Sequence, residues 1–226
     1  GVPVIPTELT TTPEQMRAAF ARNGCRAVFK KPISTEGEDI FVVRTAEQLE
    51  RAITKLPHAD HRLIAQPMID SQIGRNLEPG LRDAFERHLR PDLLERLHDE
   101  SAVLKHEFRV QTSRLPNGEI DIAAIYARVG TGDVNNIAQG AQGVRVNFSD
   151  LHPTDQQSIR AAARELPDGG DIVGWDLIGQ PGQRRIIEGN SGSGLANVQE
   201  GYNPADVVAS YGTIMRDAAE RSRLAR

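Results

Sequence analysis

Strand-like runs in this chain occur in pairs that turns join. Three such pairs are present, at residues 26–30 with 39–43, 107–113 with 119–129, and 171–179 with 184–190. The turns of the last two pairs contain Asn117-Gly118 and Pro181-Gly182, which are strong turn signals. A short turn can join only antiparallel strands, because a parallel pair needs a crossover of about a dozen residues or more. Helical segments with one apolar face lie among these pairs without regular strand–helix alternation, which predicts the α+β class.

Three local signals add detail to this expectation. Thr45 and Gln48 resemble a capping box at the start of a helix. Within residues 70–106, leucines at helical spacing predict two helices that divide near Pro91. A further strand is expected at 144–148.

The composition is that of an ordinary globular protein. Among 226 residues, 38% are hydrophobic and 26% are charged, and the length suffices for one large domain or two small ones. The net charge of -4 provides no basic field for nucleic acid. No apolar run is long enough for a transmembrane helix and no signal peptide is visible, so we expect no membrane partner. The single cysteine, Cys25, excludes an internal disulfide, and we expect a cytoplasmic protein in which Cys25 fills space beside the first helix.

The last strand pair carries the most informative polar residues. Asp176 ends one apolar run, and Glu188 and Asn190 lie two residues apart near the end of the facing strand. Alternation places Glu188 and Asn190 on one face, and the turn between the strands brings Asp176 roughly opposite Glu188. Such a cluster is costly to bury unless cations fill it, and its oxygen ligands favour Mg²⁺ or Mn²⁺. Solvent-facing acids at strand ends are an equally good interpretation of the spacing, but the Gly-rich residues 191–195 that follow favour a site for an anion.

Two further clusters place basic residues at or near strand ends. Lys30 and Lys31 precede a polar turn at residues 34–38, from which a lysine can reach a nucleotide phosphate. Arg109 and Arg128 lie on the two strands of the second pair, where they can neutralise a transferring phosphoryl group. For each cluster alone, solvated lysines or surface arginines paired with acids are the better interpretation.

The order of these motifs resembles that of the ATP-grasp superfamily. The matching segments are AVFKKP, STEGEDIFVV, LIAQPMI, EFRV, YARVGTGDVNNIAQGA, GWDLIG and RIIEGNSGSGL. Within the superfamily, the chain is most similar to glutathione synthetase and to glutamate-adding ligases that modify ribosomal proteins. The resemblance runs from about residue 1 to a final helix expected from residue 203, and it implies two α+β subdomains with the nucleotide between them.

The resemblance also implies which residues hold the nucleotide. Lys31 resembles the lysine that contacts the ATP phosphates. In the family, the backbone of a linker holds adenine, and its counterpart here is Gln66, Pro67, Met68 and Ile69. Glu107 is assigned to the ribose, because the segment 70–106 displaces the acid that usually binds it.

Catalytic and metal-binding residues follow from the same resemblance. Arg128 and Asn136 resemble the pair that stabilises the acyl phosphate and the phosphoryl group in flight. Arg109 resembles an arginine on the substrate side. The three magnesium ligands correspond to Asp176, Glu188 and Asn190, and the loop beside the acceptor substrate corresponds to residues 191–194.

The chain departs from the family at several points. Residues 191–194 read Ser-Gly-Ser-Gly where Ser-Pro-Gly is usual, and the loop that would cover the phosphates is acidic, with Glu36, Glu38 and Asp39. A typical member also has a preceding substrate-binding domain and an earlier ATP-binding lysine, and neither is visible here.

These observations predict three parts and one activity. We expect an ATP-grasp N-terminal subdomain at 1–69, a helical insertion at 70–106, and a C-terminal subdomain with the metal site at 107–226. The expected enzyme is an ATP-dependent ligase that forms a C–N bond through an acyl phosphate, releases ADP and phosphate, and uses Mg²⁺ or Mn²⁺. Its substrates would be carboxylates and amines, either small molecules or peptides. The alternatives are a nucleotide-binding domain of a larger protein without independent catalysis, or an ATP-grasp kinase, and both a homo-oligomer and a missing N-terminal substrate domain are left open.

Overall fold

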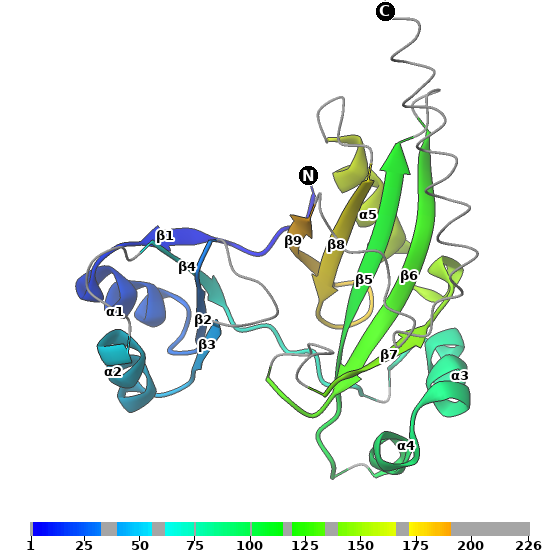
Figure 1. Ribbon diagram of the computed structural model, residues 1–226, viewed down its shortest axis with the longest axis horizontal. Helices are drawn as coiled ribbons and strands as arrows, with labels where there is room; N and C mark the ends of the chain where they lie inside the picture. The colour runs from blue at the N-terminus through cyan, green and yellow to red at the C-terminus, as the bar shows by residue number, and fades with distance from the viewer. Residues whose placement is uncertain are drawn as a thin grey trace, which may run out of the picture. The chain divides into compact units, whose positions relative to one another are not determined.

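The chain divides into two compact units, each of which combines helices with an antiparallel sheet. The computed structural model describes residues 2–32, 40–55, 62–74, 76–99, 101–114, 119–133, 140–165 and 172–190. The units are Ile5–Asp70, and Gly1–Val4 with Ser71–Arg226, and each is considered by itself (Figure 1). The predicted α+β class is confirmed. The three-part division at residues 69 and 106 stays a prediction.

The described residues of the unit 5–70 form a four-stranded sheet with two helices. The strands lie in the order β1-β4-β2-β3, with β1 at Glu8–Thr10, β2 at Ala27–Lys30, β3 at Ile40–Val43 and β4 at Leu63–Pro67. The helices are α1 (Pro13–Arg22) and α2 (Ala46–Lys55). Their apolar faces form a core with the sheet that includes Met16, Ala19, Phe20, Phe29, Leu49, Ile53 and Leu63.

Side-chain caps set the starts of both helices. At α1, the hydroxyl of Thr12 accepts a hydrogen bond from the backbone N–H of Gln15 at 3.2 Å. At α2, the N–H of Gln48 donates to the Thr45 hydroxyl at 3.2 Å, and the N–H of Arg44 donates back to Oε1 of Gln48 at 2.7 Å. The first of these two α2 bonds satisfies a backbone N–H that the first helical turn leaves unpaired, as the predicted capping box requires. The return bond from Gln48 goes to Arg44, one residue before the position that a capping box uses.

The turn after α1 corrects the expectation for Cys25. Gly24 and Cys25 have φ angles of 67° and 59°, in the left-handed region that reverses the chain at a helix end. The side chain of Cys25 is exposed. The prediction that it fills space beside the helix was therefore wrong, because the helix ends before Cys25 can face the core.

The unit that contains residues 71–190 is built on a five-stranded sheet. The order is β7-β6-β5-β8-β9, with β5 at Lys105–Arg114, β6 at Ile120–Gly130, β7 at Gln142–Arg145, β8 at Ile172–Ile178 and β9 at Arg185–Asn190. All neighbours are antiparallel, as the paired strand pattern predicts. The predicted strand at 144–148 is shorter and ends at Arg145, because Asn147 and Asp150 bond to each other and cap a 3₁₀ helix at Phe148–Asp150.

In the described part of this unit, three α-helices accompany the sheet. They are α3 (Pro79–His88), α4 (Pro91–His98) and α5 (Pro153–Arg164). The predicted division of two helices near Pro91 is confirmed, since Pro91 begins α4. Leu81, Phe85 and Leu93 of α3 and α4 belong to the same apolar core as the sheet. Among the described residues, no helix is long and apolar enough to cross a membrane.

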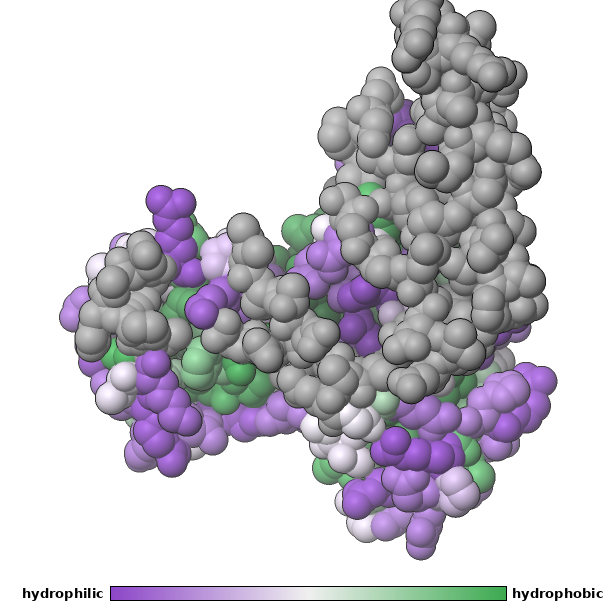
Figure 2. Space-filling model, viewed as in Figure 1, coloured by the Kyte–Doolittle hydropathy of each residue, from purple (hydrophilic) through white to green (hydrophobic). Residues whose placement is uncertain are grey.

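The two faces of the five-stranded sheet differ in character. One face is apolar and carries Phe108, Val110, Ala127, Val129, Trp175 and Leu177 into the core, and Figure 1 shows α5 behind this part of the sheet. Alternation along the strands sends the residues between them to the opposite face. Where β5 and β8 are visible in the space-filling view, that opposite face is hydrophilic (Figure 2).

A buried ion-pair network fastens the β8–β9 turn to the helices. Arg184 is 1% exposed and pairs with Glu78 at 2.5 Å and with Asp155 of α5 at 2.7 Å. Asp155 also accepts hydrogen bonds from the backbone N–H groups of Gly182 and Arg184. The guanidinium of Arg184 lies 4.6 Å from the centre of the Phe108 ring. These contacts fix where β9 begins, and therefore which residues of β9 lie opposite β8.

Removing the carboxylate of Asp155 should destabilise the protein. The Asp155→Asn variant leaves the buried guanidinium of Arg184 with one acid in place of two, and we expect a loss of about 3 kcal/mol in the free energy of unfolding. Urea denaturation measures this loss. The matched control is Asp83→Asn, an exposed acid of α3, which should change the free energy by less than about 0.5 kcal/mol. Equal effects of the two substitutions would contradict the role of Asp155.

Candidate functional site

A row of polar residues crosses the sheet on the face away from the apolar core. Arg109 of β5 lies opposite Tyr126 of β6 and opposite Asp176 of β8. Asp176 in turn lies opposite Glu188 of β9, as the sequence predicts. Residues directly opposite each other on antiparallel strands share a face. The side chains of four neighbouring strands are thus brought together, although the residues are far apart in the sequence.

Ion pairs connect the acids and bases of this face into a chain. Arg109 binds Asp176 through both its Nε and its Nη2, with Nη2 at 2.7 Å from Oδ2. Arg128 Nη2 lies 2.7 Å from Oδ1 of the same carboxylate, and Arg128 Nε lies 3.0 Å from Oε1 of Glu107. Glu107 and Arg128 also lie opposite each other in the sheet register. Two guanidiniums and two carboxylates therefore balance one another along this chain.

The chain of ion pairs is largely shielded from water. Asp176 is 5% exposed and Arg128 is 8% exposed. Charges at such depth are stable only when a partner of opposite sign is in contact. From the sequence, metal cations are expected to provide this compensation, whereas in the structure Arg109 and Arg128 already provide it for Asp176.

The two carboxyl groups respond to burial in opposite ways. Burial raises the pKa of Glu107 to about 7, even though the charge of Arg128 opposes this shift. Burial acts on Asp176 in the same sense, but the charges of Arg128 and Arg109 outweigh it and lower the pKa of Asp176. Two arginines contact Asp176 and one contacts Glu107, which accounts for the difference. Asp176 consequently stays ionised at neutral pH, and it keeps both guanidiniums on this face.

An irregularity in β9 brings Glu188 to the charged face. Asp176 pairs with Glu188 but Leu177 pairs with Ile186, so Ile187 is an extra residue in β9. Without this bulge, strict alternation would put Ile186 and Glu188 on the same face. With it, Ile186 is buried in the core and Glu188 is exposed on the other side.

The residue between the two candidate ligands Glu188 and Asn190 is Gly189, and the ring of Trp175 leaves no space for a side chain there. Gly189 pairs with Trp175, whose ring occupies the space beside it. A Cβ at Gly189 would lie 2.8 Å from a ring carbon of Trp175, which is too close for a side chain. Glu188 and Asn190 flank this glycine, and the Asn190 amide Nδ2 donates to Oε1 of Glu188 at 2.9 Å.

The oxygen atoms of Asp176, Glu188 and Asn190 fit a hard divalent cation. Each carboxylate oxygen has two acceptor lone pairs. Among contacts with described residues, Oδ1 of Asp176 is shared by both arginines, whereas Oδ2 accepts from Arg109 alone and retains room for a metal. Within the described ranges, no cluster of three His, Cys, Asp or Glu side chains is placed to hold a metal. The amide oxygen of Asn190 would therefore have to complete the set.

The remaining predicted residues lie elsewhere in the chain. Lys31 is exposed directly after β2, and the predicted linker, Gln66 to Ile69, follows from the end of β4, so both belong to the unit of residues 5–70. In that unit, the Gln66 amide donates to the Thr7 hydroxyl at 2.9 Å, and the N–H of Met68 donates to the carbonyl of Arg26 at 3.3 Å. Asn136, the polar turn 34–38, the loop 191–194 and the final helix lie outside the described residues.

Sequence reasoning overlooked Tyr126. This residue is 4% exposed, lies opposite Arg109, and its phenol acts electrostatically on both Arg109 and Arg128. Its spacing of two residues from Arg128 on a strand indicated that both share a face. The spacing is visible in the sequence Tyr126-Ala127-Arg128, but only the pairing of β6 with β5 shows that Tyr126 lies beside Arg109.

Solved structures share the fold of this chain. No protein-family model matches it, and a search of curated proteins gives no match. D-alanyl-alanine synthetase A from Vibrio cholerae has a TM-score of 0.57 at 14% identity, over 95% of this chain and 61% of that protein. A RimK domain ATP-grasp protein from Sphaerobacter thermophilus has a TM-score of 0.53 at 13% identity, over 96% and 61%.

A third structure contains a bound nucleotide. Carboxyaminoimidazole ribonucleotide synthase from Aspergillus clavatus, complexed with ATP, has a TM-score of 0.55 at 13% identity, over 84% of this chain and 41% of that protein. Together these similarities show that the chain has the ATP-grasp fold. At the same time, it spans only 41% to 61% of the length of these proteins.

The raised pKa of Glu107 predicts a pH dependence of stability. The carboxyl titrates near 4.5 in the unfolded chain and near 7 in the folded, metal-free protein. The folded state keeps a proton that the unfolded chain releases, so this group's contribution to stability falls as pH rises from about 4.5 to about 7. The Glu107→Gln variant has no carboxyl group to titrate, so it does not lose this stability. The free energy of unfolding of the variant minus that of the parent should therefore increase by up to about 3 kcal/mol between pH values of about 4.5 and about 7.

Urea denaturation at a series of pH values, with a chelator present, measures this difference. The control is Glu95→Gln, an exposed glutamate of α4, which should follow the pH curve of the parent protein. A difference between Glu107→Gln and parent that is constant with pH would show that Glu107 titrates normally.

Proposed function

We propose that this chain is the nucleotide-binding and catalytic part of an ATP-dependent ligase that joins a carboxylate to an amine. The observation that carries the proposal is the row Arg109, Asp176 and Glu188 on one face of a sheet in an ATP-grasp fold. Acids suited to metal and bases suited to phosphate lie side by side there, as phosphoryl transfer from ATP requires.

In the proposal, Asp176, Glu188 and Asn190 hold Mg²⁺ or Mn²⁺. The metal would neutralise charge on the β- and γ-phosphates. Support comes from the oxygen-only donor set and from the bulge that turns Glu188 toward the Asp176 side of the sheet. The Asp176 carboxylate would contact the metal through Oδ2 while Oδ1 keeps its bonds to the arginines.

The arginines are assigned to the reacting groups. Arg128 and Asn136 would stabilise the γ-phosphoryl group as a substrate carboxylate attacks the γ-phosphorus, and Arg109 would face the substrate. ADP leaves and an acyl phosphate forms, and attack of an amine on its carbonyl carbon gives an amide and releases phosphate and a proton. Asp176 supports these roles because it holds both guanidiniums in fixed positions before any substrate arrives.

The nucleotide base is assigned to the backbone of residues 66–69, and the phosphates to Lys31. Pro67 has no N–H, and the N–H of Met68 already donates to Arg26. Adenine recognition would therefore use carbonyl groups of this linker and the N–H of Ile69. Glu107, which lies beside Arg128, is proposed for the ribose. ATP and Mg²⁺ as co-substrate and cofactor also favour a cytoplasmic location.

A nucleotide-binding module without its own catalysis is the second candidate. The observation in its favour is that the chain spans only 41% to 61% of the length of its structural neighbours, so groups that bind the substrates can lie in another domain. A kinase would use the same phosphate site with a different acceptor.

Product analysis separates these possibilities. With ATP, Mg²⁺ and a panel of amino acids and short peptides, a ligase should release ADP and phosphate in equal amounts together with an amide product, identified by mass spectrometry. A kinase would instead yield a stable phosphorylated product without free phosphate. Binding of ATP with no ADP release from any mixture would favour the non-catalytic module and contradict the ligase proposal.

Glu188→Gln should separate metal use from nucleotide binding. Loss of one metal-ligating oxygen's charge should lower metal-dependent turnover by about 10³-fold, on the scale of other electrostatic catalytic groups, while ATP binding measured by calorimetry weakens far less. Glu95→Gln, on the exposed face of α4, is the control and should retain full activity. Full turnover in Glu188→Gln would remove Glu188 from the metal site.

A further inference from the structure

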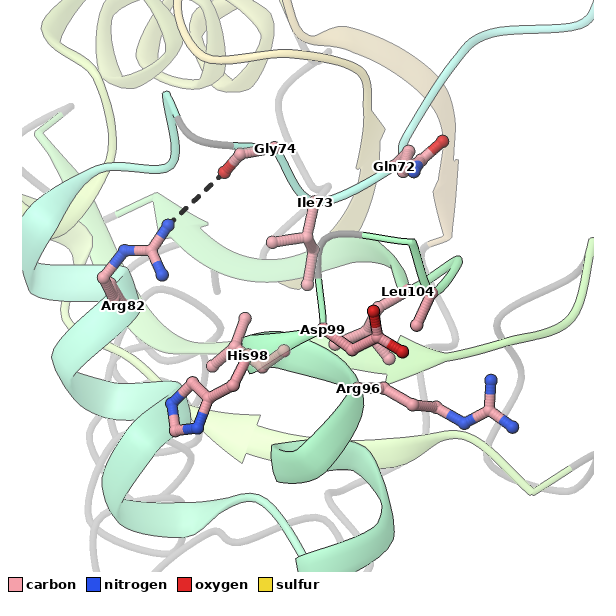
Figure 3. A pocket seen from close by; sticks show the side chains of 10 residues that line it. Gln72, Ile73, Gly74, Arg82, Arg96, His98, Asp99 and Leu104 are labelled. Atoms are coloured by element: carbon pink, nitrogen blue, oxygen red, sulfur yellow. Dashed lines mark hydrogen bonds between the residues drawn. The ribbon is translucent and has the colours of Figure 1, made fainter.

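A cavity with no residue in common with the charged row lies in the unit that contains residues 71–190. It has a volume of about 540 Å³ and is bordered by α3, α4 and the segments 72–74 and 102–104 (Figure 3). This volume is within the range of small-molecule sites, about 300–1,000 Å³. None of the residues proposed above for ATP, metal or catalysis lines it.

The floor of this cavity is apolar and held by backbone hydrogen bonds. Ile73, Leu97, Ala102 and Leu104 contribute its apolar side chains, and Ile73 points into the middle of the view in Figure 3. The N–H of Ile73 donates to the carbonyl of Leu104 at 2.7 Å, and Gln72 pairs with Lys105. The floor is therefore formed before any ligand binds, and a ligand gains by covering its apolar surface.

The rim of the cavity carries more positive than negative charge. Arg82 comes from α3, and Arg96 and His98 come from α4, with Arg82 and Arg96 on opposite sides of the view. Asp99 is the acid of the rim, and its Oδ1 already accepts from the N–H and the hydroxyl of Ser101, at 2.9 and 2.7 Å. Apart from His98, the rim carries two guanidiniums and one carboxylate, which is an excess of one positive charge.

The guanidinium of Arg82 has spare donor capacity. Its Nη2 lies 3.5 Å from the carbonyl of Gly74, beyond the usual N–H···O range of about 2.7–3.2 Å. A guanidinium carries five N–H donors in a planar fork that matches a carboxylate. Arg82 is half-buried, which reduces the screening of its charge by water. An anionic group near Arg82 would replace this long contact with a charge-assisted one.

We propose that this cavity binds a small monocarboxylate with a compact, branched apolar body. The carboxylate would lie at Arg82, and the apolar body would cover Ile73, Leu97 and Leu104. The region of α3 and α4 is mostly hydrophilic on the surface, with smaller apolar areas between (Figure 2), which suits a ligand that combines both characters. The site is independent of the proposed ligase chemistry.

The probe for this site is N-acetyl-leucine, with its neutral amide, N-acetyl-leucinamide, as the matched ligand. Titration of the ¹⁵N-labelled chain should give dissociation constants of roughly millimolar for the acid, because most of the rim is exposed to solvent. The amide should bind about fivefold more weakly, which is the effect of one exposed charge pair. Acetate, which has the charge without the apolar body, should not bind measurably.

Variants locate the carboxylate. Arg82→Gln should weaken binding of the acid about fivefold, the effect of one exposed charge pair, and leave the amide unchanged. The matched control is Arg87→Gln, an exposed arginine of α3 whose Nε donates to a backbone carbonyl of its own helix, and it should bind as the parent does. Chemical shift changes should be concentrated at Ile73, Leu97 and Leu104, and the unchanged spectrum elsewhere shows that the variants are folded.

Three results would overturn the proposal. They are no binding of N-acetyl-leucine at up to about 20-fold its expected millimolar dissociation constant, equal affinity for acid and amide, or full affinity in Arg82→Gln. ATP and metal are left out of the titration, so neither success nor failure of the ligase assay changes how these results are interpreted.

Discussion

The arrangement of the candidate site depends on one buried carboxylate, Asp176, between two guanidiniums. Arg109 reaches it from the neighbouring strand β5, and Arg128 reaches it from β6. Because the carboxylate is almost inaccessible to water, its charge requires these two partners. Asp176 in turn holds both guanidiniums on this face of the sheet. Three strands are thereby connected on their charged face by ion pairs and on the other face by the apolar core.

This electrostatic arrangement also explains how one site can serve opposite charges. Glu188 and Asn190 extend the row on the acidic side, toward β9, whereas Arg128 and Tyr126 lie on the basic side, on β6. A metal–nucleotide complex presents both signs, with cations and phosphate oxygens close together. In the proposed function, this sheet face, on which acids and bases are joined in ion pairs, would bind both signs without rearrangement of its strands, which is the form of preorganisation that lowers barriers in phosphoryl transfer.

Local signals in the sequence predicted the elements of the fold, and nonlocal pairing decided the site. The capping residues of α1 and α2, Pro91 at the start of α4 and the pair Asp176–Glu188 all follow from short-range patterns. The contact of Arg109 with Asp176 joins residues 67 positions apart, and no local pattern specifies which strand lies beside β5. Two predictions were wrong because of local turns. Asn147 and Asp150 cap a 3₁₀ helix that ends the strand predicted at 144–148, and the turn at Gly24 keeps Cys25 out of the core.

The extra residue in β9 has a consequence for how this hairpin can vary. Before Ile187, β9 places Ile186 in the apolar core. After Ile187, the alternation is shifted by one residue, so Glu188 lies on the charged face. Substitutions can change either half independently. Insertion or deletion of a single residue affects more of the strand, because it would move every later side chain to the opposite face of the sheet. The hairpin should therefore tolerate substitutions better than insertions or deletions, because its length determines whether Glu188 faces Asp176.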